Sequence, residues 1–302
     1  MDWFLIQALL PDAIIIGLSI GIVYGLVALG VSLIYSGLDI VHFAHGEIFM
    51  FGAFFGLVLF KDFGIAYPIT LFLAMILTGI LGVIIERFCY RRLTSQGGGY
   101  TVAGMGMIIC GFGMAIILQN IAFLIWGADG KAMPVDFGKP IDIGTITLPR
   151  SYMWILIVSV GLMAILHFFL KYTKIGLAVR AVAANKDIAY LMGINVPLMI
   201  SLIFGVACAL AAAGGTLIGP INYVQVEMGY LMLIKAFAAA VVGGFGSLPG
   251  AILGGLLVGV FETLGATYIS GSHKDIYAFI LLIFVLMVRP AGLLGSNIKV
   301  KA

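Results

Sequence analysis

Apolar residues run through this chain in long segments, and polar positions gather between them. The run AIIIGLSIGIVYGLVALGVSLIY (13–35) exceeds the roughly 20 apolar residues that a helix needs to cross a bilayer. The pattern predicts membrane helices over nine ranges: 13–35, 47–60, 66–86, 101–125, 151–170, 199–219, 230–246, 249–266 and 276–289. The second, the seventh and the last two are short, so we expect about 8–9 transmembrane helices with interrupted or re-entrant segments.

Composition agrees with this pattern. Of the 302 residues, 63% are hydrophobic and 10% are charged, whereas soluble domains carry roughly 25% charged residues. The sequence lacks the alternating segments of about ten residues that are typical of transmembrane β-barrels. We predict an all-α polytopic membrane protein whose residues 1–302 form a single transmembrane domain, with no nucleic-acid partner.

Lysine and arginine positions predict the orientation, because positive residues near helix ends stay on the cytoplasmic side. Ten of the sixteen lie in three clusters, at 87–92, 171–186 and 289–301. We therefore expect a cytoplasmic C-terminus and, with nine crossings, an external N-terminus.

Two loops are long. The predicted outer loop, 127–150, is rich in Gly, Pro and Asp and fits a turn-rich cap. The predicted inner loop, 171–198, holds apolar residues at helical spacing with basic residues between them, and then Gly193 and Pro197. This pattern predicts a short amphipathic helix in the cytoplasm.

An internal repeat relates the two halves, near 13–125 and 199–289. GIVYGLVALGVSLIY (21–35) matches GVACALAAAGGTLIG (205–219) at Gly, Leu, Ala and Ile positions, and FGAF (51–54) lies near IKAF (234–237) in a similar register. The loop charges make the two copies an inverted repeat, a common plan in transporters with the pathway between the repeats.

Histidine and glutamate interrupt the apolar pattern in IVHFAHGEIFMFGAF (40–54). The spacing of His42, His45 and Glu47 differs from that of helical zinc sites, and no further ligand is evident, which argues against a metal and against an intramembrane enzyme. Two interpretations stay open. These side chains cap helix ends near the membrane interface, or they line a translocation pathway with Ala44 and Gly46 at a glycine-bracketed break.

A second interruption, in AFAAAVVGGFGSLPGAILGGLLVGVFE (236–262), is rich in glycine. Close helix packing accounts for many of these glycines. One interrupted segment in each half points to a pathway, which would include Gly243, Gly244, Gly246 and Ser247. The segment lacks the GK[ST] ending of a phosphate-binding loop.

Few other residues suggest a binding, catalytic or metal-ligating role. Lys235 and Glu262 lie within apolar segments, and we expect Lys235 to extend to the membrane interface. The three cysteines have no paired spacing and are interpreted as core residues. No catalytic grouping is evident, so we predict no catalytic residue and no metal.

Three long motifs carry a resemblance: VHFAHGEIFMFGAF, GLAVRAVAANKDIAYLMGINV and KAFAAAVVGGFGSLPGAILGGLLVG. They occur in the order seen in LivH-type permease subunits of bacterial ABC importers for branched-chain amino acids, and the chain resembles that family from about Gly17 to Gly292. Permeases for urea and short amides share much of the pattern. The resemblance implies a multi-pass permease of the bacterial inner membrane, without enzyme activity of its own.

The resemblance also implies partners. These are a second permease subunit (LivM-type), two cytoplasmic ABC ATPases that bind ATP and Mg²⁺, and a periplasmic substrate-binding protein; this chain would bind no cofactor. The inner loop is similar to the coupling element that docks on the ATPase, where Asp187, Ala189 and Gly193 occupy E-x-A-x-x-x-G spacing with Asp in place of Glu and Ile188 in place of the first Ala. The implied coupling residues are Arg180, Ala184, Asn185, Asp187, Ala189, Gly193 and Ile194. A self-sufficient secondary transporter, which needs no docking helix, is the alternative class.

Overall fold

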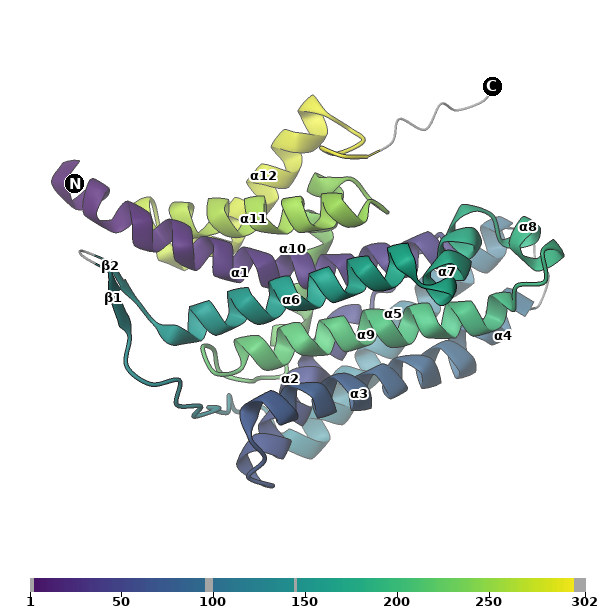
Figure 1. The fold of residues 1–302 in the computed structure, drawn as a ribbon, viewed down its shortest axis with the longest axis horizontal. Coiled ribbons are helices and arrows are strands. Elements are labelled where there is room, and N and C mark those ends of the chain that lie inside the picture. The colour runs from purple at the N-terminus through teal and green to yellow at the C-terminus, as the bar shows by residue number, and fades with distance from the viewer. Residues whose placement is uncertain (1–2, 96–99, 144–145, 296–302) are drawn as a thin grey trace. The chain divides into compact units, whose positions relative to one another are not determined.

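The computed structural model describes residues 3–95, 100–143 and 146–295, and helices make up most of them (Figure 1). In chain order the elements are α1 (Trp3–Leu38), α2 (His45–Lys61), α3 (Tyr67–Ile85), the π-helix η1 (Glu86–Tyr90), α4 (Arg91–Ser95), α5 (Tyr100–Trp126), β1 (Ile141–Ile143), β2 (Ile146–Leu148), α6 (Arg150–Tyr172), α7 (Lys174–Ala184), α8 (Lys186–Leu191), α9 (Val196–Ile218), α10 (Met228–Gly243), α11 (Leu248–Tyr268), the 3₁₀-helix η2 (Gly271–His273) and α12 (Lys274–Val288).

Each of the nine predicted apolar ranges contains a helix, although the seventh range runs past the end of α10 at Gly243. Within the described residues, seven helical stretches are long and apolar enough to cross a membrane, and α10 is a shorter apolar helix. α2 has 17 residues and is also short. The prediction of an all-α polytopic membrane protein with short segments among its spans is confirmed.

The outer loop contains regular structure that the sequence pattern did not predict. β1 and β2 pair as an antiparallel hairpin between α5 and α6. An isolated bridge also joins Lys131 to Val224, with both backbone N–H···O bonds at 2.9 Å. The first half of this loop is therefore fixed to the segment that precedes α10.

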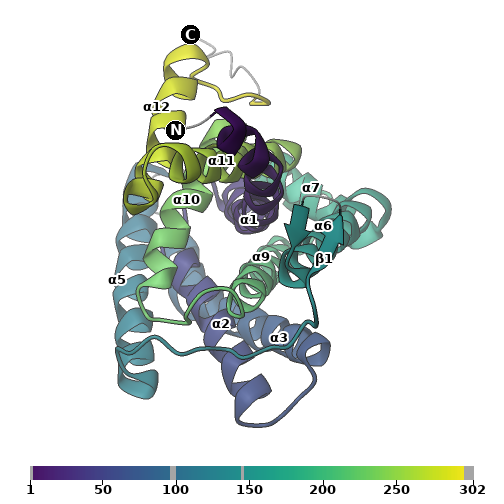
Figure 2. The same ribbon diagram turned by 90° about the vertical axis from the view of Figure 1, so that its left-hand side faces the viewer.

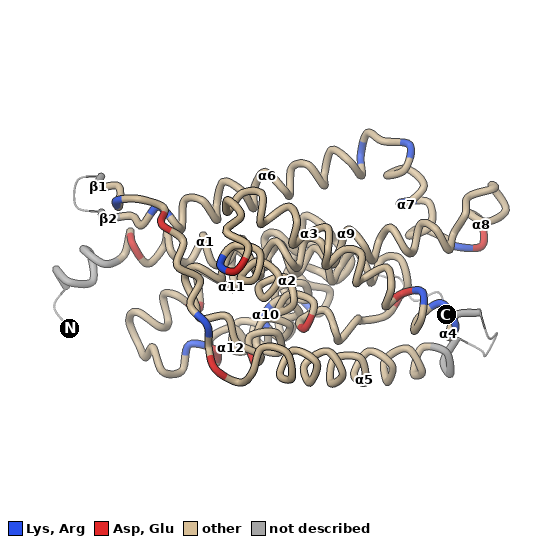
Figure 3. The backbone as a smooth tube through the Cα atoms, turned by 90° about the horizontal axis from the view of Figure 1, so that it is seen from below, with Lys and Arg blue, Asp and Glu red and all other residues tan. Residues whose placement is uncertain are grey.

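Charged residues lie mostly near helix ends (Figure 3). α5 carries none over its whole length. Lys235 and Glu262 depart from this pattern because they lie within apolar helices and are buried, and Glu47, although in the first turn of α2, is buried as well. Each of them therefore needs a partner or a function.

The chain divides into two compact units. Unit 1 comprises Met1–Ser32, Asp136–Val160 and Ile234–Ala302, and unit 2 comprises Leu33–Val135 and Gly161–Leu233. Each is described by itself. That the chain is a single transmembrane domain stays a prediction.

In unit 2, α2, α3 and α9 pack against one another (Figure 2). The contact between α2 and α9 is a backbone contact: a Cβ on Gly52 would lie 2.2 Å from Ala212 Cα, and one on Gly215 would lie 2.1 Å from the Phe49 carbonyl oxygen. Thr216 Oγ1 adds a hydrogen bond to the Gly52 carbonyl at 3.0 Å. Small residues are therefore required on both faces.

In unit 1, α1 packs against α11 in the same manner. A Cβ on Gly259 would lie 2.2 Å from Gly21 Cα, and one on Gly255 would lie 2.2 Å from the Gly25 nitrogen. These glycine positions let the two helix backbones touch.

This packing supports the predicted repeat. The sequence match equates α1 with α9, and both α3 and α11 carry proline in their first turn. α1 packs on α11, while α9 packs on α3. The first helix of one copy, α1, thus contacts the third helix of the other, α11, and α9 contacts α3 in the same way. This exchange is expected of two intertwined repeats. Their inverted orientation in a membrane stays a prediction.

Gly52→Val tests the backbone contact. Overpacking costs about 1–3 kcal/mol, so we expect a lower midpoint of thermal unfolding in detergent. Gly113→Val on α5 is the matched control, because no atom lies within 4 Å of the added Cβ. Equal midpoints for the two variants would contradict the packing described.

Candidate translocation site and coupling segment

The break between α1 and α2 begins at Asp39. This residue has φ of 60°, a left-handed conformation that no other non-glycine residue of the described chain adopts. Aspartate tolerates this conformation better than most residues, and isolated cases often mark functional sites. The chain then turns inward, because His42, Ala44 and His45 are all buried.

His42 is held by a second interrupted helix. Its Nδ1 lies 2.7 Å from Tyr90 Oη, and its ring lies edge-on to Phe204. Tyr90 ends the π-helix η1, which extends α3. The Nε2 atom of His42 has no hydrogen-bond partner in the described structure, although only 1% of the residue is exposed.

α2 begins directly after the break. Its N-cap, Ala44, offers no side-chain acceptor, so the first amides of the helix lack a side-chain cap. Glu47, in the first turn, is only 4% exposed, and its Oε2 has no partner among the described atoms. Glu47 makes no side-chain cap, but its place in the first turn of α2 fits stabilisation of the helix N-terminus by charge, so both the capping and the pathway interpretations stay predictions.

α2 meets α10 at its first turn. A Cβ on Gly46 would lie 2.3 Å from the Gly229 carbonyl oxygen, and one on Gly229 would lie 2.8 Å from Glu47 Oε2. Both glycines are in the first turn of their helix. The N-termini of the two short helices thus touch, and the Glu47 carboxylate lies at the junction.

The predicted repeat accounts for this meeting. The shift of 183 positions that carries FGAF at 51 to IKAF at 234 also carries Gly46 to Gly229. Equivalent positions of two repeats contact each other only where a symmetry axis passes between them. In this predicted register the counterpart of the first break is the segment 219–227 between α9 and α10, which our sequence reasoning missed although the register pointed to it.

The predicted pathway residues near 243–247 lie in a different feature. They form the turn between α10 and α11, in unit 1, where Gly244 and Gly246 have φ of 109° and 81°. Ser247 caps α11 by accepting a hydrogen bond from the Gly250 nitrogen at 3.2 Å. The backbone of Leu294 bonds to the Gly243 carbonyl at 2.8 Å. A tight turn accounts for these glycines, and their place on a pathway stays a prediction.

Lys235 does not extend to an interface as expected. It is 8% exposed, and its Nζ lies 2.7 Å from Glu262 Oε1 and 2.7 Å from Asp275 Oδ1. Tyr24 Oη lies 3.3 Å from both Lys235 Nζ and Glu262 Oε1. The sequence showed one lysine and one glutamate in separate apolar segments but gave no signal that they pair.

The inner loop forms two helices where one was predicted. Asn185, in an extended conformation, ends α7 and caps α8 by accepting a hydrogen bond from the Ile188 nitrogen at 2.9 Å. Gly193, with φ of 81°, reverses the chain after α8. Arg180 of α7 donates to the Leu170 carbonyl and so ties α7 to the end of α6.

α8 exposes an apolar surface that we call the α8 surface. Its members are large side chains that are more than half exposed: Ile188, Tyr190, Leu191 and Met192. Of the implied coupling residues, Ala184, Asn185, Asp187 and Gly193 are also exposed, whereas Ala189 is buried. An apolar patch beside a charged residue on a short helix is typical of a docking surface.

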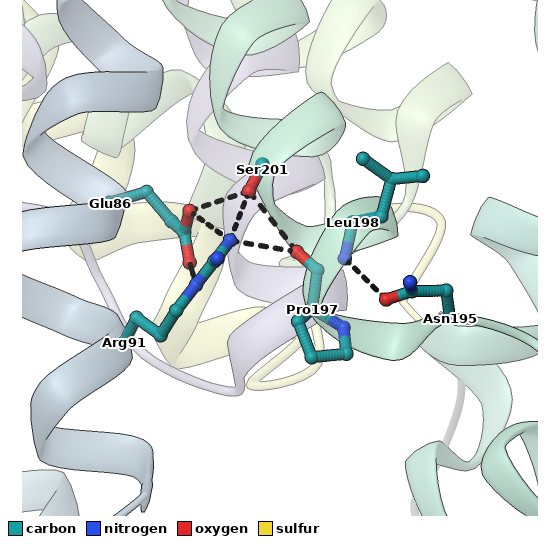
Figure 4. A network of polar contacts seen from close by, with 6 residues as sticks. All are labelled: Glu86, Arg91, Asn195, Pro197, Leu198 and Ser201. Carbon is teal, nitrogen blue, oxygen red and sulfur yellow. Dashed lines mark hydrogen bonds and ion pairs between the residues drawn. The ribbon is translucent and has the colours of Figure 1, made fainter.

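Polar contacts anchor this segment at both ends. Lys186 Nζ lies 2.9 Å from Asp39 Oδ2, which joins α8 to the break after α1. At the other end, Arg91 bonds to both carboxylate oxygens of Glu86 and to Ser201, as Figure 4 shows. Arg91 also donates to the Pro197 carbonyl at 3.2 Å, at the start of α9.

These features define a polytopic α-helical membrane protein of the kind in which transporters build their pathways, from short helices that meet within the fold. The chain belongs to the branched-chain amino acid transport system/permease component family, whose model matches residues 13–287.

Individual relatives support this family assignment. The high-affinity branched-chain amino acid transport system permease protein BraD of Pseudomonas aeruginosa is 38% identical over 296 residues, covering 92% of this chain and 94% of BraD. The LivH permease protein of Escherichia coli K12 is 34% identical over 295 residues, covering 92% and 93%. The solved structure of PsaBC from Streptococcus pneumoniae in complex with Fab has a similar fold, with a TM-score of 0.52 at 15% identity over 91% of each chain.

Lys235→Met tests the buried ion pair. Removing one partner of such a pair costs about 3–5 kcal/mol, because the other charge is left buried and unpaired. We expect a marked fall in the thermal unfolding midpoint and partial recovery in the Lys235→Met/Glu262→Gln double variant. A double variant less stable than the single one would contradict the pairing.

Proposed function

We propose that this chain is one membrane subunit of an ATP-binding-cassette importer that carries leucine, isoleucine, valine or related amino acids across the bacterial inner membrane. Partner ATPases bind and hydrolyse ATP, and this chain supplies part of the pathway. Family membership and the relatives named above support the substrate class. The observation that carries the coupling is the α8 surface, which a self-sufficient secondary transporter would not need.

The proposed complex has four kinds of component besides lipid. A second, LivM-type permease subunit completes the pathway, two cytoplasmic ATPases dock on α7 and α8, and a periplasmic binding protein delivers the amino acid. The exposed apolar side chains of α8 fit a groove in a soluble partner, because a short amphipathic helix can insert its apolar face there.

The α8 surface also has a route to the pathway. Lys186 joins α8 to Asp39, and five residues further along the chain lies the first buried residue of the α2 N-terminus, Ala44. Arg91 fixes the opposite end of the segment to α3 and α9. Movement of α8 by a docked ATPase would therefore act on the break between α1 and α2 and on α9, whose Phe204 lies against His42.

ATP-dependent uptake tests the proposal as a whole. The complete transporter, purified with its ATPases and reconstituted with the binding protein in proteoliposomes, should accumulate radiolabelled leucine only when ATP is available to the ATPases. Uptake of urea or a short amide in place of leucine would overturn the substrate class, and uptake without an ATPase would overturn the importer class.

Leu191→Asp tests the docking surface. Leu191 is 82% exposed, so the change should leave the permease folded while a charge on the apolar face removes co-purification of the ATPase and lowers uptake at least tenfold. Phe63→Asp is the matched control, because Phe63 is 71% exposed in the loop between α2 and α3, predicted on the opposite side of the membrane. An ATPase that stays bound to the Leu191→Asp variant as firmly as to the control would contradict docking at α8.

A further inference from the structure

The junction of α2 and α10 combines two features with opposite charge. Each helix N-terminus carries about half a positive charge from its unpaired amides, so two together supply about one. Glu47, at the same point, supplies a carboxylate. Both features lie in unit 2 and are buried.

The Glu47 carboxylate lies in the first turn of α2 and leaves one oxygen unpaired. Glu47 Oε2 has no hydrogen-bond partner among the described residues, and the side chain is more than nine-tenths buried. Lys235, by contrast, is matched to Glu262 and Asp275. An unmatched carboxyl group in a buried site costs several kcal/mol when it is ionised. Ionisable residues in apolar helices normally face a cavity or a partner, and a bound positive group would be such a partner.

We propose that Glu47 and the two facing helix N-termini bind the backbone of a zwitterionic amino acid. The ammonium group lies on the Glu47 carboxylate, and the carboxylate group accepts hydrogen bonds from the first amides of α2 and α10. This inference rests on the proposed function, because it assigns the recognition site for the transported amino acid.

Charge balance makes the site selective. A zwitterion places a negative group against the two helix ends and a positive group against Glu47, so neither partner stays unmatched. Leucine without its amino group, 4-methylpentanoate, would leave Glu47 buried and unpaired and would add a second negative charge. Isopentylamine, which lacks the carboxylate, would leave the amides unmatched.

His42 extends the site by one polar atom. Its Nδ1 is fixed by Tyr90, and its Nε2 is buried without a partner, three residues before the start of α2. The amino acid enters when the N-termini of α2 and α10 separate, because Gly46 and Gly229 are in contact in the structure described here.

Substitution of Glu47 is the first test, made on the reconstituted transporter with its partners. We expect Glu47→Gln to lower the initial rate of leucine uptake at least tenfold, with the amount of assembled complex within twofold of the wild type. Glu227→Gln is the matched control, because it removes the same charge next to α10 from an exposed side chain, and it should keep uptake within twofold. Glu47→Gln uptake within twofold of the wild type would overturn the inference.

Protection of the wild-type protein is the second test and needs no variant to fold. Dicyclohexylcarbodiimide modifies buried carboxyl groups in membrane proteins, and mass spectrometry reports each site. L-leucine should slow modification of Glu47 at least fivefold, and 4-methylpentanoate and isopentylamine at the same concentration should not. Equal protection by 4-methylpentanoate, no protection by leucine, or no modification of Glu47 in any state would overturn the site.

The two proposals fail in different ways. If the wild-type complex takes up no branched-chain amino acid, the proposed function fails. If it takes up leucine but Glu47→Gln does so equally well, only the binding site fails.

Discussion

The contact between the first turns of α2 and α10 is the constraint on which the site depends. α2 has 17 residues and α10 has 16, so each is about 25 Å long, less than the roughly 30 Å of a bilayer core. A helix that ends within the membrane exposes backbone amides, which is tolerated only where protein or a polar route covers them. Glycine at both positions lets the two ends cover each other, and an added Cβ at either one would separate them.

The same constraint explains how the rest of unit 2 is arranged. Close packing of α2 on α9 through Gly52 and Gly215 fixes one side of the junction. The π-helical turn after α3 brings Tyr90 to His42 and Glu86 to Arg91 and Ser201. Exposed ion pairs such as Lys186 with Asp39 contribute only about 0–1 kcal/mol, so the contact between α8 and the break is a weak one. The Glu86–Arg91 pair, with both carboxylate oxygens bound, is the firmer anchor.

Hydropathy predicted the helices well because every helix that crosses lipid needs a long apolar stretch. Each of the nine ranges contains a helix, and the doubtful ones included the two short helices that form the junction. The pattern could not predict that Asn185 divides the inner loop, since the side-chain cap that ends α7 and starts α8 depends on local geometry. The hairpin of β1 and β2 was missed for a similar reason, because three-residue strands give almost no periodic signal.

The site was predicted in part. His42, Ala44, His45, Gly46 and Glu47 were singled out because they are polar or small within an apolar run, and the structure places them in one buried cluster. Their partner across the repeat, Gly229, carries no chemical signal of its own, and only the register of the two copies points to it. The pairing of Lys235 with Glu262 depends on three-dimensional packing of α10 and α11, which no spacing in the sequence encodes.

The central claim is that the break before α2 faces the translocation route. Its most direct measurement is the reactivity of a cysteine at Ala44, a small and fully buried position, in a transporter whose native cysteines have been replaced. The account predicts that a water-soluble maleimide modifies this cysteine while the assembled complex hydrolyses ATP and transports leucine, and leaves it unmodified in the resting complex. Absence of labelling in every state would contradict the account and would remove this break from the route.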